Sequence, residues 1–315
     1  MTPSPPAAGL PPAKKPLIQE GVNEWIRGLA IPGSDVPFSV LPPAAELSNQ
    51  TVFTQIPESL LGAPIDSYLR NDPYPIPCCA DREGYHGDRH LDWWLSGLHD
   101  FLKVHQASEQ HGLGLAPGDR VFELGCASGR VLRHFSAQRA QLQTWGSDIS
   151  LRHVEWVRQH LSSSIKIFQN TVLPHLPLED NFFSVVSAFS VFSHIDEFEL
   201  SWLAELRRIL KPGGIAYLTI HSEHTWQNMS PEWPIYAALM HMRDQIIGYN
   251  ISESFFQAPL PREKTVFRWP SAATYNTNVF HSYSYIKDAW GRLLDVVDII
   301  PMGHNYQDVV ILRKP

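Results

Sequence analysis

Short hydrophobic runs alternate with amphipathic segments through the middle of the chain. Patterns typical of buried strands occur at 120–124, 143–149, 165–168, 183–191 and 215–220. Between them, apolar residues recur every three or four positions, which is typical of helices that bury one face. Strands separated by helices of about ten to fifteen residues indicate βαβ crossovers. The pattern therefore predicts an α/β fold with a doubly wound, mostly parallel sheet that is covered on both faces.

Further elements are predicted on either side of this alternation. An amphipathic helix is expected at 88–111, where leucine and tryptophan residues share one face and a glycine follows. Near the other end, a helix at 283–294 precedes strands at 296–301 and 308–312. These two strands are close enough in sequence to form an antiparallel hairpin. The expected sheet then has seven strands.

We expect one domain with four parts, preceded by a tail. The tail, residues 1–20, is rich in proline and has no apolar run, so we expect it to be disordered and not a signal sequence or anchor. Residues 21–115 form an N-terminal helical extension and 116–220 the ligand-binding core. Residues 221–281 are an aromatic-rich insertion, and 282–315 are the C-terminal helix and hairpin.

The composition is informative mainly because it argues against several kinds of partner and location. Hydrophobic residues make up 43% of the chain and charged residues 18%, which is typical of a folded protein. The formal net charge is −7 and no dense Lys/Arg block occurs, so we expect no nucleic-acid partner. No apolar run reaches the ~20 residues that cross a bilayer, so we expect no membrane span. Three cysteines without metal-type spacing favour a reducing, cytoplasmic location, and nothing indicates the oligomeric state.

The segment 121–130, Val-Phe-Glu-Leu-Gly-Cys-Ala-Ser-Gly-Arg, joins a predicted buried strand to the next helix. Gly125 permits a turn that a Cβ would obstruct, and Gly129 lets a ligand approach the backbone near a helix N-terminus. Asp148 ends the next strand, where a carboxylate can accept hydrogen bonds from both ribose hydroxyls. A plain tight turn and a dinucleotide site are the alternatives, but Ala127 interrupts the G-x-G-x-x-G dinucleotide fingerprint. The segment favours a nucleoside or amino-acid ligand.

The E-x-G-x-x-x-G spacing of this segment resembles motif I of the class I S-adenosylmethionine-dependent methyltransferases, whose third glycine is Ala127 here. Residues 206–214, Leu-Arg-Arg-Ile-Leu-Lys-Pro-Gly-Gly, resemble the run that leads into the fifth strand of these enzymes. Residues 176–195 are similar to their L-P-F…F-D-x-V stretch, with Ser184 in place of the usual Asp. The resemblance covers 119–220 and extends through the C-terminal helix and hairpin.

The resemblance implies transfer of a methyl group from S-adenosylmethionine. By position, Glu123 would contact the methionine ammonium, directly or through water, and Asp148 would hold the ribose. Asn170 or Thr171 would contact the adenine, although Asn170 is equally suited to cap a loop. The expected cofactor-binding residues are Glu123, Gly125, Cys126, Ala127, Gly129, Asp148, Ile149, Asn170, Thr171 and Ser190.

Methyl transfer from a sulfonium depends mainly on alignment of the acceptor and exclusion of water. A hydroxyl acceptor must also lose a proton, which histidine accepts near neutral pH. His194 follows the fourth strand at the ligand-binding edge of the sheet, so it is the first catalytic candidate and His221 the second. A structural hydrogen bond or helix cap is the alternative for His194. His221 and His224 have H-x-x-H spacing without a Cys or carboxylate partner, so we expect no metal.

The aromatic insertion predicts either a lid over the acceptor or a small core of its own. The candidate substrate-binding residues are Trp226, Tyr236, Trp269, Tyr275 and His281. We therefore expect methylation of a small molecule, with O-methylation of a sugar or secondary metabolite first and N-methylation second. A macromolecular methyltransferase acting on RNA or protein and a catalytically idle Rossmann-like binding protein are the remaining alternatives.

Overall fold

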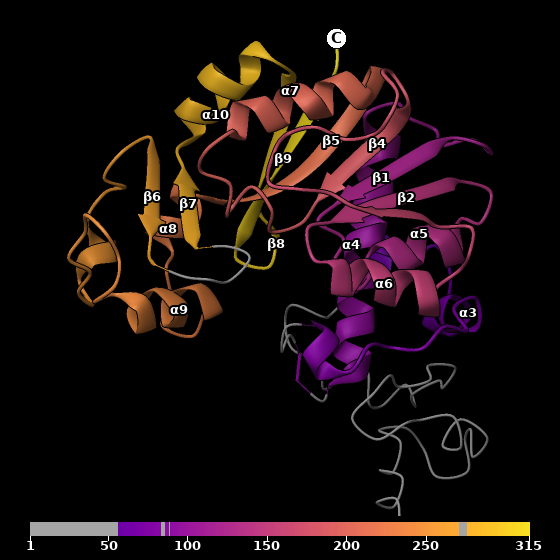
Figure 1. The fold of residues 1–315 in the computed structure, drawn as a ribbon, viewed down its shortest axis with the longest axis horizontal. Coiled ribbons are helices and arrows are strands. Elements are labelled where there is room, and N and C mark those ends of the chain that lie inside the picture. Colours follow the sequence, from indigo (N-terminus) through magenta and orange to yellow (C-terminus); the bar gives the residue numbers. More distant parts are fainter. Residues whose placement is uncertain (1–55, 83–85, 88, 271–275) are drawn as a thin grey trace, which may run out of the picture.

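The computed structural model describes residues 56–82, 86–87, 89–270 and 276–315. Within these ranges it shows a twisted central sheet with helices on both faces (Figure 1). The tail predicted at 1–20 lies outside the described residues. None of the helices in these ranges combines the length and apolar character that a membrane crossing requires.

Seven strands form the sheet that the sequence pattern predicts. Across the sheet the order is β3 (Lys166–Gln169), β2 (Gln143–Asp148), β1 (Arg120–Leu124), β4 (Phe183–Ala188), β5 (Leu210–Ser222), β9 (Gln307–Arg313) and β8 (Asp295–His304). β1 to β5 pair in parallel, and β9, which is antiparallel to both β5 and β8, is the one of the seven that runs in the opposite direction. The order reverses direction between β1 and β4, and ligands of open α/β sheets bind at such a switch point, beside the carboxyl ends of the strands.

The sheet has nine strands in total, because the insertion adds β6 (Lys264–Arg268) and β7 (Thr277–His281). β7 runs parallel to the last two residues of β5, and β6 pairs antiparallel with β7. The expected count of seven was therefore too low. The insertion extends the sheet at the carboxyl end of β5, beside the switch point (Figure 1).

The start of β5 also differs from the prediction, which placed it at 215. Helix α7 (Glu199–Ile209) ends directly before β5, so the Pro-Gly-Gly run lies inside the strand instead of between the two elements. A Cβ on Gly214 would stand 2.9 Å from the Lys211 carbonyl oxygen and 3.0 Å from that of Ser184. The glycine thus allows close contact where the register between β4 and β5 shifts.

Helices cover the two faces of the sheet in two groups (Figure 1). On one face lie α4 (His90–Gln110), α5 (Leu132–Gln138) and α6 (Leu151–His160); on the other lie α7 and α10 (Tyr283–Ala289), which a 3-10 turn at Trp290–Arg292 extends. Each face of the sheet has a hydrophobic core. Successive side chains of a strand point to opposite faces, so alternate residues of one strand belong to different cores. Val121 and Val185 pack in the α4 core, whereas Phe122 and Val186 pack in the α7 core.

The N-terminal extension is anchored to the core by α4 and by a buried ion pair. A Cβ on Gly97 of α4 would overlap the Arg130 carbonyl oxygen, so this glycine lets the helix rest on the turn after β1. Asp72 makes two hydrogen bonds with Arg133, at 2.7 and 2.9 Å. Before α4 the described chain has only short helices, as expected: Glu58–Leu60, α3 (Ile65–Arg70) and Cys79–Arg82.

The insertion builds a core of its own. Its remaining elements are α8 (Glu223–Gln227), α9 (Pro234–Met242) and a 3-10 turn at Phe255–Gln257. Trp226 is 1% exposed, its indole Nε1 donates to the Ala258 carbonyl oxygen at 2.7 Å, and Phe256, Phe267 and Phe280 surround it. Of the two roles considered for the aromatic residues, the described part of the insertion shows the core.

Ser184, which stands where the resemblance places Asp, has a compensating neighbour. Its hydroxyl donates to Asp119 Oδ1 at 2.7 Å, and Lys211 Nζ donates to the same oxygen at 3.1 Å. Asp119 thus supplies the carboxylate that position 184 lacks, next to the run that leads into β5.

Candidate functional site

The turn after β1 has the backbone conformation of a glycine-rich loop, although it contains only two glycines. Gly125 has φ +71° and Ala127 has φ +46°, so the alanine adopts the left-handed conformation that favours glycine. The amide nitrogens of Gly125 and Cys126 both donate to the Ser147 carbonyl oxygen, at 2.8 and 3.0 Å. The replacement of the third glycine by Ala127 therefore leaves the shape of the turn intact.

Glu123 lies at the carboxyl end of β1 and is 3% exposed. Its Oε2 atom is buried and has no hydrogen-bond partner among the described residues. Burial raises the pKa of Glu123 to about 8, and although Arg130 opposes this shift, Asp100 and Asp148 add to it. A buried carboxylate in this position requires either a proton or a cationic ligand.

Asp148 ends β2 and is already oriented by backbone amides. Its Oδ2 accepts from Ala127 N and its Oδ1 from Ser150 N, both at 2.8 Å. His153 Nδ1 lies 3.4 Å from Oδ1. Because a carboxylate offers about four lone-pair sites, the group can still accept ribose hydroxyls while it ties the turn after β1 to β2.

The residues after β2 and β3 lie at the same edge of the sheet. Asn170 N donates to the Asp148 carbonyl oxygen at 3.1 Å, and the buried Oδ1 of Asn170 has no hydrogen-bond partner among the described residues. Thr171 accepts from Leu173 N in a local turn at 3.2 Å, and Ile149 O accepts from Gln169 Nε2 at 2.9 Å. Asn170 is therefore better placed than Thr171 to receive a donor from a ligand.

Gly129 and Cys126 serve the turn differently from the prediction. A Cβ on Gly129 would lie 2.7 Å from Leu161 Cδ1 and 3.3 Å from Val157 Cγ2, so close packing against the C-terminal end of α6 is by itself a reason for glycine there. The Cys126 side chain is 2% exposed and packs in the core beneath the turn. Any contact of Cys126 with a ligand must use its backbone.

The segment after β4 packs directly on this turn. A Cβ on Gly125 would stand 2.5 Å from Val191 Cγ2, so no larger residue fits between the two loops. Ser190, at φ +56°, donates from its amide to Thr219 Oγ1 at 2.7 Å and from its hydroxyl to Gln307 Oε1 at 3.1 Å. Ser190 thus connects the segment after β4 to β5 and to the C-terminal hairpin.

His194 and His221 come together beyond Ser190, with ring centres 6.3 Å apart. His194 Nδ1 donates to the Thr277 carbonyl oxygen at 2.6 Å, so the lone pair of its neutral ring is on Nε2. Burial lowers the pKa of His194, which keeps the ring neutral at pH 7. The sequence therefore placed His194 correctly at this edge.

His221 is less suited to accept a proton. The Gln307 amide nitrogen stands 3.1 Å from His221 Nε2, and since an amide nitrogen only donates, the ring proton belongs on Nδ1. Burial, with His194 and His281 nearby, holds the pKa of His221 well below its ordinary value. His221 is thus a buried, hydrogen-bonded residue, and of the two histidines His194 is the better placed to accept a proton.

The predicted substrate-binding residues do not form one wall. Trp226 is in the core of the insertion, and the half-buried Tyr236 and Trp269 pack against that core. His281 is fully buried, 3.4 Å from Glu199 Oε2 on the α7 side. Tyr275 lies outside the described residues. Packing places the Trp226 side chain in the core of the insertion and that of His281 beside α7, and their assignment to an acceptor site stays a prediction.

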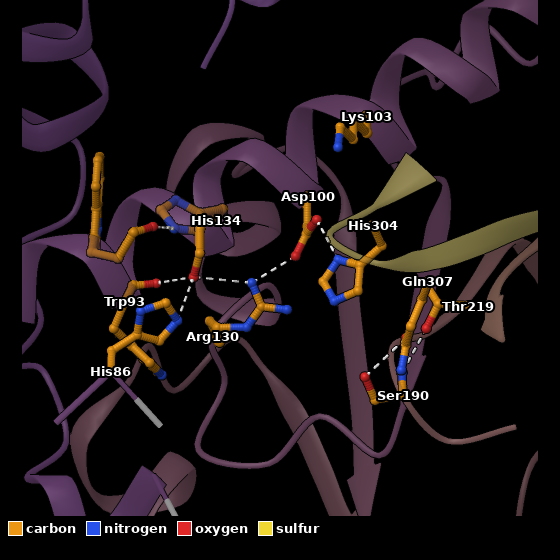
Figure 2. Close-up of polar contacts among 12 residues, drawn as sticks. His86, Trp93, Asp100, Lys103, Arg130, His134, Ser190, Thr219, His304 and Gln307 are labelled. Atoms are coloured by element: carbon orange, nitrogen blue, oxygen red, sulfur yellow. Dashed lines mark hydrogen bonds and ion pairs between the residues drawn. The ribbon is translucent and has the colours of Figure 1, made fainter. Parts of the chain in front are cut away.

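Figure 2 shows a polar network around Arg130, Asp100 and His304 that the sequence analysis did not identify. Arg130 Nη1 donates to Asp100 Oδ2 at 2.6 Å, and His304 Nδ1 lies 2.9 Å from Asp100 Oδ1. The network joins α4, the turn after β1 and the C-terminal hairpin. Arg130 stood inside the glycine-rich segment, but nothing in the sequence indicated its partners.

Comparison with known proteins agrees with this geometry. Residues 122–218 match the family described as "Methyltransferase domain". This segment is thus similar to a methyltransferase domain. It includes most of β1, the turn after it, β2, β3, β4 and most of β5.

Individual relatives are distant. Sterol 24-C-methyltransferase ERG6B of Gibberella zeae is 28% identical over 115 residues, which cover 35% of this chain and 30% of that protein. The ubiquinone/menaquinone biosynthesis C-methyltransferase UbiE of Cupriavidus pinatubonensis is 25% identical over 157 residues, 46% of this chain and 59% of that protein. The chain thus matches from about a third to somewhat over half of the length of these relatives. A solved S-adenosylmethionine-dependent methyltransferase of Clostridium acetobutylicum has a TM-score of 0.44 at 12% identity and covers 68% of this chain and 89% of its own.

The cofactor of such enzymes, S-adenosylmethionine, fits the residues of the segment 122–218. The partnerless Glu123 Oε2 suits the methionine ammonium, Asp148 retains acceptor capacity for ribose hydroxyls, and Asn170 Oδ1 can accept from an adenine amino group. Within the described ranges, no three His, Cys, Asp or Glu side chains are grouped so that they could bind one metal ion.

Proposed function

We propose that this chain transfers the methyl group of S-adenosylmethionine to a small-molecule acceptor at the carboxyl edge of β1, β2 and β4. The observation that carries the proposal is the buried, partnerless Oε2 of Glu123 beside a turn held in a glycine-type conformation. A site of this kind, in a segment similar to a methyltransferase domain, is matched by a ligand that brings a cation, a ribose and an adenine.

The bound cofactor supplies a methyl group on a positively charged sulfur. In the proposed mechanism the protein contributes mainly position. Glu123 binds the ammonium, Asp148 orients the ribose, and the loop from Ser190 to His194 lies over the turn after β1 through the contact of Val191 with Gly125.

For the acceptor, we propose O-methylation of a hydroxyl group on a sugar or secondary metabolite, with His194 as general base. Its hydrogen bond to the Thr277 carbonyl oxygen leaves the lone pair on Nε2, and its lowered pKa keeps it neutral at pH 7. A neutral, oriented imidazole is the state that a proton acceptor needs.

C-methylation of a small molecule is the second candidate. It is favoured by the names of the two relatives, a sterol 24-C-methyltransferase and a ubiquinone/menaquinone biosynthesis C-methyltransferase. Removal of a proton from carbon or from an enol would use the same base. This second candidate concerns only the kind of atom that receives the methyl group.

The test has two stages. Calorimetry with S-adenosylhomocysteine, the demethylated cofactor, should show saturable binding; no saturable heat with the folded protein would refute the proposal. Incubation with ¹³C-methyl S-adenosylmethionine and fractionated small metabolites should then label a product. The carbon chemical shift of the new methyl group distinguishes attachment to oxygen from attachment to carbon. Label that appears only in RNA or protein would contradict a small-molecule acceptor.

A further inference from the structure

The segment 193–199, which leads from β4 to α7 and carries His194, is hydrogen-bonded to β7 of the insertion. His194 and Thr277, 83 positions apart, bind each other in both directions. His194 Nδ1 donates to the Thr277 carbonyl oxygen, and Thr277 Oγ1 donates to the His194 carbonyl oxygen, both at 2.6 Å. Next to this pair, Val279 N donates to the Ser193 carbonyl oxygen at 2.8 Å. β7 therefore holds both the ring and the backbone of the proposed base.

β6 holds the same segment farther along the chain. Lys264 Nζ donates to the Asp196 carbonyl oxygen at 2.7 Å and forms an ion pair with Glu199. Arg268 forms ion pairs with Asp196 and, at 3.3 Å, with Glu197. Glu199 is the first residue of α7 and is 2% exposed, so its pair with Lys264 joins β6 to the buried start of that helix. Both strands of the insertion thus contact the segment after β4.

The contact with Thr277 determines which nitrogen of His194 can accept a proton. A neutral imidazole has one N–H group and one lone pair, and the partner of each nitrogen decides where they are. The Thr277 carbonyl oxygen takes the proton side at Nδ1. Thr277 itself is 5% exposed and pairs with Arg268 of β6, so its carbonyl group is held by a strand. Groups supported by strands are oriented more precisely than groups supported by loops.

We propose that the strand pair β6–β7 of the insertion positions His194 for proton transfer. Thr277 is the positioning residue that contacts the base, and Arg268 supports the same segment from the surface through Asp196. The insertion thus serves the reaction through the segment after β4, in addition to packing a core of its own. The inference rests on the proposed role of His194 as general base, and it adds the element that orients this base.

NMR spectroscopy of the protein labelled with ¹⁵N-histidine measures the tautomer of His194 without cofactor or acceptor, and His194→Gln assigns the signals. At pH 7 the parent should carry the ring proton on Nδ1. In Thr277→Val the His194 carbonyl oxygen loses the hydroxyl donor, so the backbone can move away from β7 and weaken the bond of Nδ1. The ratio of the Nδ1–H form to the Nε2–H form should then fall roughly 3- to 10-fold, the usual effect of one hydrogen bond.

Two variants separate positioning from a general loss of packing. Thr277→Ser keeps the hydroxyl group and should restore the parent ratio. Thr265→Val is the matched control, because Thr265 is a fully buried threonine of β6 whose Oγ1 donates to the Arg262 carbonyl oxygen at 3.0 Å, inside the insertion. This control loses a comparable hydrogen bond, and its His194 ratio should equal that of the parent.

A surface variant tests the inference even if Thr277→Val does not fold. The side chain of Arg268 is 43% exposed, so Arg268→Gln opens no cavity. It should lower the His194 tautomer ratio in the same direction by about twofold, because an exposed ion pair contributes less than a buried hydrogen bond. Arg243→Gln, which removes an exposed pair with Asp244 at the end of α9, should leave the ratio unchanged.

A ring proton on Nε2 in the parent would overturn the inference, as would an unchanged ratio in folded Thr277→Val or, where that variant does not fold, in Arg268→Gln. An equal fall in Thr265→Val would overturn it too, since it would indicate general loosening of the insertion. Calorimetry should show S-adenosylhomocysteine binding within about twofold of the parent in all of these variants. Failure of the parent to bind it would count against the proposed function and would leave the tautomer result intact.

Discussion

The turn after β1 and the insertion at 221–281 both reach the carboxyl edge of the sheet, but they are built differently. The turn uses backbone conformation, with left-handed residues at Gly125 and Ala127 and amides directed at Ser147 and Asp148. The insertion uses side-chain packing around Trp226. Local sequence thus specifies the shape of the turn after β1, whereas contacts between distant segments specify the insertion.

The largest expected effect follows from enlarging Gly125. In Gly125→Val the side chain meets Val191 and the residue must keep φ +71°, so we expect no measurable binding of S-adenosylhomocysteine by calorimetry. Gly248→Val is the matched control, since Gly248 has φ +84° with no atom within 4 Å of the added Cβ. The control should bind like the parent. Parent-like affinity in folded Gly125→Val would show that the turn is not the cofactor site.

Replacement of His194 tests the proposed removal of a proton from the acceptor. If it is the general base, His194→Ala should lower single-turnover methyl transfer by roughly 10²- to 10⁴-fold while cofactor affinity changes little. The parent rate should rise with pH through an ionisation below the ordinary histidine value, because burial lowers the pKa of His194. His194→Gln should be equally impaired, whereas partial rescue by glutamine would indicate an orienting role. Near-normal transfer in His194→Ala would remove it from the mechanism.

Trp226→Ala separates packing from ligand binding. Removal of this 1% exposed side chain should lower the free energy of unfolding by about 3–5 kcal/mol, as measured by chemical denaturation. Binding of S-adenosylhomocysteine should stay within about twofold, because the turn after β1 does not depend on the insertion core. Trp226→Phe should be milder. A variant as stable as the parent that had lost methyl transfer would restore the lid interpretation.

Asp148→Ala has the smallest expected effect of these substitutions. We expect a loss of binding free energy of roughly 1.5–3 kcal/mol, since the variant removes a charged acceptor from the ribose and a partner from Ala127 N. The loss should be the same for S-adenosylhomocysteine and 5′-methylthioadenosine, which share the ribose. A loss confined to S-adenosylhomocysteine would place Asp148 at the amino-acid end instead.

The difference between these two regions also explains what the sequence could predict. The strand at 120–124 matches β1 residue for residue, because its apolar residues Val121, Phe122 and Leu124 are close together and a glycine follows directly. β6 and β7 were missed, since their pairing with each other and with β5 is tertiary and leaves no period in the aromatic-rich segment.

The sequence pattern was sufficient to place Glu123 and Asp148 at the ends of β1 and β2 but gave no sign of the network around Arg130. Asp100 lies 30 positions from Arg130 and 204 from His304, and no local pattern encodes such contacts. Gly129 was assigned to the ligand because a glycine after a strand has two physical reasons, ligand approach and helix packing. The position of Leu161, which the sequence does not reveal, shows that helix packing applies at Gly129.

The central claim is that the buried carboxyl group of Glu123 receives the ammonium of the cofactor. Its raised pKa, about 8 against about 4.5 in the unfolded chain, means that the free folded protein holds a proton there at pH 7. The corresponding stability is fully present below pH 4.5 and is lost as the pH rises through 8. A bound ammonium should reverse this preference and release the proton.

The direct measurement is calorimetry of S-adenosylhomocysteine binding at pH 7 in two buffers with different ionisation enthalpies. The account predicts release of about one proton per ligand bound by the parent and none by Glu123→Gln, which should also bind more weakly. Binding without proton release in the parent, or with the same release and affinity in Glu123→Gln, would contradict it.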